Sequence, residues 1–193
     1  YTFNLHNGVK KQLTSGNFEV QELLLSRDCR WFYMKTNEEH PGETHFYKMS
    51  VNGGERVRLT NMSGGNTVVL SPDEKMLAIR YSNTTTPWEL YVQNNEPGQI
   101  AVRVTFSQTT EFKAYSWKKP EVVSFKARDG KEIFARVYQP RRKNGKGVIF
   151  VHGAGYLQNA HKWWSQYYRE FMFHNLLVDK GYTVMDIDYR ASS

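Results

Sequence analysis

The sequence predicts a mixed fold in which repeated units of β-strands come first and an α/β unit with parallel strands follows. Three observations support this prediction. A pattern of four short strands recurs with a period of 45 residues, a hairpin pattern begins after Pro120, and a strand, a helix and a second strand fit within 147–189. Four-stranded units at such a period are typical of the blades of a β-propeller.

The repeat appears as two pairs of similar segments. VQELLLSRDCRWFYMKTN is matched by NTVVLSPDEKMLAIRYSN, and THFYKMSVNGGERVRLT by WELYVQNNEPGQIAVRVT. Ser26 and Ser71 occupy the same place in the first pair, 45 residues apart. Alternating apolar positions and turn residues predict these strands: 20–26, 30–35, 44–51 and 56–60 in the first unit, and 67–71, 76–82, 89–94 and 101–105 in the second.

Turn chemistry separates the predicted strands. Ser71-Pro72-Asp73-Glu74 places proline at the second turn position, where its fixed φ fits, and Asn52-Gly53-Gly54 suits a hairpin that needs positive φ. We therefore expect two complete blades, with 1–14 as the outer edge of a preceding one, so that the propeller is open at its N-terminal side. The apolar residues expected between neighbouring strands and units are Leu23, Leu25, Val69 and Ile79.

The pattern changes near Pro120, and we expect a domain boundary there, with blades over 1–118 and a second domain over 119–193. PEVVSFKARDGKEIFARVYQP predicts a hairpin with strands at 121–127 and 132–139 around an Arg-Asp-Gly turn. This hairpin would lead the chain into the second domain.

A strand–helix–strand unit follows the hairpin. We expect strands at 147–152 and 182–189, and a helix over 163–180 whose apolar residues recur at i, i+3 and i+4. Gly181 can end that helix with a positive φ. Such a unit is right-handed and has parallel strands. Because parallel sheets are covered on both faces, we expect further chain beyond it, as in the start of an α/β-hydrolase domain.

The charge pattern argues against a nucleic-acid-binding protein. The formal net charge is +7, but the basic residues are scattered. The densest group is Arg141, Arg142, Lys143 and Lys146, which follows Pro140 and surrounds Asn144-Gly145. We expect it to be a solvated loop rather than a phosphate-binding patch.

Composition also bears on membranes, metals and cofactors. No run of eighteen apolar residues occurs, so no membrane span is expected in this segment. Cys29 is the one cysteine, which leaves no internal disulfide and no thiolate cluster. A zinc site is not expected either, since His152, His161 and His174 do not have ligand spacing on one rigid element. We expect no cofactor.

The segment GVIFVHGAGYLQNA carries the main chemical signal. An apolar strand that stops at His-Gly-Ala-Gly can deliver backbone amides to the floor of a hydrolase active site. No Gly-x-Ser-x-Gly nucleophile motif is present in the sequence. Ser192 and Ser193 follow a strand but lack flanking glycines, so neither is expected to be a nucleophile.

Taken together, these segments resemble the prolyl oligopeptidase and dipeptidyl peptidase IV family of serine peptidases, in its dipeptidyl peptidase IV-like branch. FYMKTNEEHPGETHFYKMSVNGGERVRLT resembles a late propeller blade, and the 120–140 hairpin resembles the crossover into the catalytic domain. VIFVHGAGY resembles the strand and loop before the first helix, and DIDYRASS the family's Asp-x-Arg-Gly-Ser segment. Ala191 replaces the usual glycine there, and Ala154-Gly155 replaces Gly-Pro.

The resemblance implies a piece of a longer serine peptidase that releases Xaa-Pro or Xaa-Ala dipeptides from peptide amino termini. None of the Ser/Asp/His triad would then lie in this chain, which would be inactive by itself. An acyl-peptide hydrolase or esterase on the same fold, or a non-catalytic propeller binding module, remain alternatives. The implied partners are peptide substrates and not nucleic acid; the implied parent is homodimeric and extracytoplasmic, either periplasmic or secreted.

The resemblance also suggests site residues. His152 stands where the family often carries an oxyanion-binding tyrosine, so its side chain, or the amides of Gly153 and Ala154, could stabilise a tetrahedral intermediate; the alternative is that His152 only anchors the loop. Tyr156 is the substrate-pocket candidate, or else only caps the loop. An ion pair between Asp188 and Arg190 would brace the loop. Expected without a ligand role are the packing residues His161, Trp163 and Trp164, and the solvated loop residues Glu38 and Glu39.

Overall fold

The computed structural model describes residues 1–153, 157–190 and 192. The chain forms two compact units, one made of Tyr1–Tyr81 and Glu89–Thr105, the other of Ser82–Trp88 and Phe106–Ser193. Residues 106–118, which the sequence assigns to the blades, are grouped with the second unit. The division into domains at residues 118 and 119 stays a prediction.

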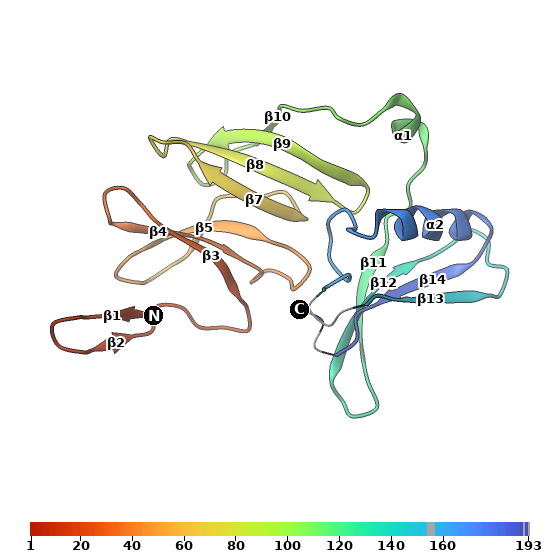
Figure 1. Cartoon of the computed structure of the whole chain (residues 1–193), viewed down its shortest axis with the longest axis horizontal. Helices are drawn as coiled ribbons and strands as arrows, with labels where there is room; N and C mark the ends of the chain where they lie inside the picture. The colour runs from red at the N-terminus through yellow and green to blue at the C-terminus, as the bar shows by residue number, and fades with distance from the viewer. Residues whose placement is uncertain (154–156, 191, 193) are drawn as a thin grey trace. The chain divides into compact units, whose positions relative to one another are not determined.

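The first unit contains two four-stranded sheets, and these confirm the two predicted blades (Figure 1). In each sheet, strands that follow one another in the chain are neighbours, and most strand ends lie within three residues of those predicted. The first sheet consists of β3 (Val20–Leu25), β4 (Trp31–Thr36), β5 (His45–Ser50) and β6 (Val57–Arg58). The second consists of β7 (Gly65–Leu70), β8 (Met76–Asn83), β9 (Thr86–Asn94) and β10 (Val102–Arg103).

The N-terminal residues form a small separate ribbon. β1 (Thr2–Phe3) and β2 (Lys10–Lys11) pair antiparallel, with Thr2 opposite Lys11. In the described structure they pair with each other and with no strand of the two larger sheets.

The two sheets share the same turn at the start of their second strands. The Ser26 hydroxyl donates to Asp28 Oδ1 at 2.6 Å and accepts from the Trp31 amide at 2.9 Å. Forty-five residues later, Ser71 makes the same contacts with Asp73 at 2.7 Å and with the amide of Met76 at 2.9 Å. These hydrogen bonds to the serines lower the pKa of both aspartates. The sequence repeat is therefore a repeat of hydrogen bonds.

The core of the first unit is formed by side chains from both sheets. Of the four core residues named from the sequence, Ile79 is buried, but Leu23, Leu25 and Val69 are 57%, 53% and 65% exposed, so the expectation is wrong for these three. β3 is an edge strand of its sheet, with a neighbour on one side only. On β7, successive side chains alternate between the two faces, so Val68 points inward and Val69 points outward. The buried apolar cluster consists of Tyr33, Phe46, Leu59, Val68, Leu77, Ile79 and Tyr81.

The second unit is built on one mixed sheet in the order β11-β12-β14-β13 (Figure 1). The first pair is the predicted antiparallel hairpin, and β13 and β14 are the predicted parallel pair. β12 and β14 join these two halves in antiparallel register. The strands are β11 (Glu121–Lys126), β12 (Glu132–Tyr138), β13 (Gly147–Val151) and β14 (Thr183–Ile187).

In the described part of this unit, two helices complete the fold. α1 (Thr110–Ala114) is short and was not predicted; the Thr109 side chain caps its N-terminus by accepting from the Phe112 amide. α2 (Tyr168–Asp179) connects the parallel strands, but it begins five residues later than the predicted start at 163. The backbone amides of Trp164 and Tyr167 donate to the hydroxyls of Ser82 and Ser165, so the chain before residue 168 follows an irregular path.

The core of the second unit is aromatic. Trp164 and Phe171 meet edge to face, with 4.6 Å between ring centroids, and Phe112 and Trp117 pack beside them. The prediction that Trp164 packs within the fold is confirmed. No helix in the described parts of the chain is long and apolar enough to cross a membrane.

Candidate active site

The candidate site lies where the parallel strands β13 and β14 end. Val151 is opposite Ile187 in the register, so the residues that follow, His152 and Asp188, emerge side by side. His152 Nε2 lies 3.1 Å from Asp188 Oδ1, and the two side chains are 0% and 8% exposed. A carboxylate oxygen only accepts, so this contact is a hydrogen bond when Nε2 carries a proton.

The Asp188 carboxylate also holds the following loop. The backbone amide of Asn159 donates to Oδ1 at 2.7 Å, and that of Ala160 donates to Oδ2 at 3.0 Å. A buried charge is tolerated where several donors replace water, and here an imidazole and two amides do so. Asp188 thereby connects β13, β14 and the loop before α2.

The His152 ring faces inward. Nδ1 lies 3.0 Å from the carbonyl oxygen of Gly153, and the ring stacks on Tyr189 with 4.9 Å between centroids. Both ring nitrogens therefore contact the protein. The two roles expected for His152, binding the oxyanion and anchoring the loop, stay predictions. Gly153 is exposed, and a Cβ added there would meet no atom within 4 Å. Ala154 and Tyr156 lie outside the described residues.

Ser192 places a third side chain near this pair, since its Oγ lies 3.3 Å from His152 Nε2. Serine, histidine and aspartate are the residue types of a catalytic triad, but in a triad the serine and the aspartate contact opposite ring nitrogens. Here both contact Nε2. The arrangement therefore lacks triad geometry, and Ser193 lies outside the described residues.

The ion pair expected between Asp188 and Arg190 is replaced by other contacts. Asp188 contacts His152 and the two loop amides, whereas Arg190 NH1 lies 2.7 Å from Asp129 Oδ2, in the turn of the β11–β12 hairpin. The physical reason is that the two side chains point in different directions. Asp188 turns into the fold, whereas the Arg190 side chain remains 61% exposed at the surface.

A second set of buried polar residues fixes the loop and was missed from the sequence. Asn159 Nδ2 donates to Asp186, which lies two residues before Asp188 on β14. Burial raises the pKa of Asp186 to about 6, while the nearby positive charge of Arg136 opposes this rise. Arg136 and Asp186 are cross-strand partners. The sequence did contain a signal for these two residues, because each is a charged residue inside an otherwise apolar strand. No sequence signal pointed to Asn159.

Arg136, on β12, connects the sheet to the loop before α2. Its side chain is fully buried, and its Nε and NH2 donate to the carbonyl oxygens of His161 and Trp163 at 2.8 and 3.0 Å. The His161 ring stacks on Trp163 with 4.0 Å between centroids. Burial, assisted by the charge of Arg136, lowers the pKa of His161 well below its usual range. His161 and Trp163 therefore pack within the fold, as expected.

The three histidines considered for zinc each have other surroundings. Burial lowers the pKa of His174 to about 4, and its ring packs against Tyr138 and Phe150 with centroid distances of 5.5 and 5.2 Å. Within the described ranges, no group of three histidine, cysteine or acidic side chains could hold a metal ion.

In the first unit, Glu39 is exposed as the sequence predicted, but Glu38 is mostly buried, so the prediction of a solvated loop is wrong for Glu38. Glu38 accepts from Nε and NH2 of Arg56 at 2.9 and 2.6 Å, and its side chain is only 15% exposed. Glu39 pairs with Arg58 at 3.1 Å and accepts from the Tyr47 hydroxyl at 3.2 Å. Arginines thus match both carboxylates within the blade.

Comparison with known proteins agrees with this architecture. Residues 1–88 match the family model of the dipeptidyl peptidase IV (DPP IV) N-terminal region. The chain is 26% identical over 206 aligned residues to dipeptidyl peptidase 8 of Mus musculus, a match covering 93% of this chain. The chain is therefore similar to proteins of the dipeptidyl peptidase IV family.

Other relatives extend the likeness beyond the matched N-terminal region. The uncharacterized peptidase YuxL of Bacillus subtilis (strain 168) is 24% identical over 176 residues, covering 89% of this chain. The crystal structure of Porphyromonas gingivalis dipeptidyl peptidase 4 shares the fold over 96% of this chain, with a TM-score of 0.76 and 20% identity. The chain spans 22% and 25% of the two curated relatives and 26% of the crystallised protein.

Proposed function

We propose that the full-length protein containing this chain is a serine exopeptidase that releases dipeptides of the Xaa-Pro or Xaa-Ala type from peptide amino termini. The observation that carries the proposal is the His-Gly loop that follows β13 and is tied through His152 to Asp188 after the adjacent parallel strand. Oxyanion loops of α/β hydrolases occupy the end of such a strand. The names of the dipeptidyl peptidase relatives support the peptidase class.

The proposed mechanism is acyl transfer by a Ser/His/Asp triad contributed by parts of the protein outside these 193 residues. In this chain, the amide of Gly153 is the candidate donor to the oxyanion, with Ala154 as the second candidate. Loss of one such donor raises the activation free energy of acyl transfer by roughly 3–4 kcal/mol. His152 and Asp188 act by holding the loop, and 119–193 act as the start of the catalytic domain. The propeller over 1–118 would restrict access to small, extended peptides.

The test is hydrolysis of chromogenic Xaa-Pro and Xaa-Ala dipeptide substrates by the full-length protein. We expect turnover when the substrate amino group is free and much less when it is acylated. Preference for acylated peptides or aryl esters would instead identify the acyl-peptide hydrolase or esterase that shares such a loop. Absence of turnover on every substrate would reject the peptidase and favour a binding module.

A further inference from the structure

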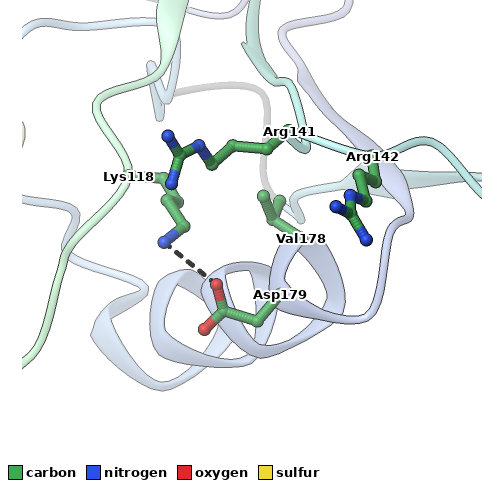
Figure 2. Close-up of a pocket in the computed structure, with 5 residues that line it drawn as sticks. All are labelled: Lys118, Arg141, Arg142, Val178 and Asp179. Carbon is green, nitrogen blue, oxygen red and sulfur yellow. Dashed lines mark ion pairs between the residues drawn. The ribbon is translucent and has the colours of Figure 1, made fainter.

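A cavity of about 610 Å³ in the second unit lies away from the strand ends that carry the candidate active site. It is lined by Lys118, Arg141, Arg142, Val178 and Asp179 (Figure 2). Three segments contribute to it: the linker before β11, the loop between β12 and β13, and the end of α2.

The backbone around this cavity is held in place. The Lys118 amide donates to the Asn175 side chain of α2 at 2.7 Å. In the loop that carries the arginines, the amide and the side chain of Asn144 donate to the carbonyl oxygens of Gly181 and Lys180, at 2.9 and 3.0 Å. A Cβ at Gly181 would lie 2.9 Å from the Arg142 carbonyl oxygen, so loop and helix end are in close contact.

The charges that line the cavity are not balanced. Asp179, the one acidic lining residue described, pairs with Lys118 Nζ at 3.0 Å and accepts from the Tyr115 hydroxyl at 2.7 Å. These two contacts lower the pKa of Asp179 and keep it ionised. Arg141 and Arg142 are exposed to solvent, and among the described residues neither has a side-chain hydrogen bond or ion pair. Two positive charges therefore line the cavity without an acidic partner.

The end of α2 does not account for these arginines. Cations often lie near a helix C-terminus because they interact with its free carbonyl groups. Here the carbonyls of Leu177 and Val178 already accept from the backbone amides of Tyr182 and Gly181. Asn144 binds the carbonyl of Lys180. The guanidinium groups therefore cap no carbonyl of this helix.

We infer that this cavity binds a small anion that carries a phosphate-like group. Arginine guanidinium groups present paired N–H donors that match the oxygens of phosphate, and such charge-assisted bonds are among the stronger hydrogen bonds of proteins. Lys118 adds a third cation, already shared with Asp179. The arginine loop is exposed, as the sequence predicted, and the inference adds a binding role to it. This site is independent of the proposed peptidase function.

The test is calorimetric titration of the full-length protein with inorganic phosphate at constant ionic strength. We expect saturable binding at one site, and at least tenfold weaker binding in the Arg141→Gln/Arg142→Gln double variant. The Lys143→Gln/Lys146→Gln double variant is the matched control, because it removes the same charge from the same loop at positions that do not line the cavity. It should bind phosphate nearly as tightly as the unmodified protein.

Two results would overturn the inference. Equal weakening in both double variants would show that the net charge of the loop attracts anions without a site. Absence of saturable binding to the unmodified protein would show that the cavity has no phosphate site. An Arg141→Lys variant adds a test of geometry, since it keeps the charge but loses the paired donors, and it should bind phosphate more weakly than the unmodified protein. Every variant is compared by its phosphate binding, so the outcome does not depend on the result of the peptidase assay.

Discussion

His152 Nε2 and Asp188 Oδ1 lie 3.1 Å apart, and each residue directly follows one of two neighbouring parallel strands. The strands bring together residues that are 36 positions apart in the sequence. The same carboxylate accepts from the amides of Asn159 and Ala160, so a single side chain holds both the start and the middle of the loop between β13 and α2. From this geometry we propose that Asp188 is a positioning residue for the candidate oxyanion loop.

Replacement of Asp188 tests this role in the full-length protein. Asp188→Asn removes the charge that accepts from three donors, so we expect the free energy of unfolding of this unit to fall by about 2–4 kcal/mol. We expect kcat to fall on the order of tenfold or more, with a smaller change in KM, because loop placement matters most in the transition state. Steady-state kinetics and amide exchange of 157–162 measure the two effects.

Asp129→Asn is the matched control for that substitution. Asp129 forms an exposed ion pair with Arg190, and such pairs contribute little to stability. It should leave kcat and the exchange of 157–162 unchanged. Equal effects of the two substitutions would mean that Asp188 has no special part in placing the loop.

His152→Ala addresses the partner in the same contact. Removal of the buried ring leaves the Asp188 carboxylate with one donor fewer, so we expect kcat to fall far more than KM rises. The effect should not add to that of Asp188→Asn, because both remove the same contact. A double-mutant cycle on kcat/KM measures the coupling. Full additivity, or an unchanged kcat in His152→Ala, would contradict a shared positioning role.

The buried acid Asp186 predicts a specific pH dependence of stability. Burial raises its pKa from 3.8 to about 6, so the folded state binds more protons than the unfolded state in this range. Its contribution to stability is therefore complete below pH 3.8 and is lost as the pH rises through 6, amounting to about 3 kcal/mol by linkage.

His174 and His161 act in the opposite direction. The pKa of His174 falls from 6.5 to about 4, so stability from this residue rises with pH across that interval, and that of His161 does likewise. In the unmodified protein these contributions partly cancel. Asp186→Asn should therefore make the stability of the second unit rise more steeply between about pH 4 and 6. Exchange of β14 amides, corrected for the intrinsic effect of pH, measures the slope; an unchanged slope would refute the raised pKa.

The fourth prediction concerns the contribution of the repeated serine turn to the stability of the two blades. Ser26→Ala and Ser71→Ala each remove a hydroxyl that bonds an aspartate and a backbone amide. Ser26 is buried and Ser71 only partly so, which leads us to expect losses of about 1–2 and about 0.5–1 kcal/mol in the free energy of unfolding. Chemical denaturation measures both. Ser116→Ala, at an exposed position, serves as the control; losses no larger than its loss would contradict the structural role of the repeat.

The sequence by itself determined the strand order of both blades, the hairpin and the parallel pair. These features depend on local signals, namely alternation of side chains, turn residues and the helical spacing of apolar residues. The serines 45 residues apart make the same turn because each turn is closed within six residues. For the same reason the hairpin around Arg128-Asp129-Gly130 was predicted nearly to the residue.

Only the tertiary structure decided which partners the polar side chains bind. Asp188 binds His152 and two loop amides rather than nearby Arg190, and Asn159 binds Asp186, because strand register and the path of the loop set these distances. The start of α2 at Tyr168 also follows one distant contact, since the Trp164 amide binds Ser82, and one local contact, since the Tyr167 amide binds Ser165. Side-chain type limits which bonds can form, but segments distant in the sequence must first be folded together before one of those bonds is selected.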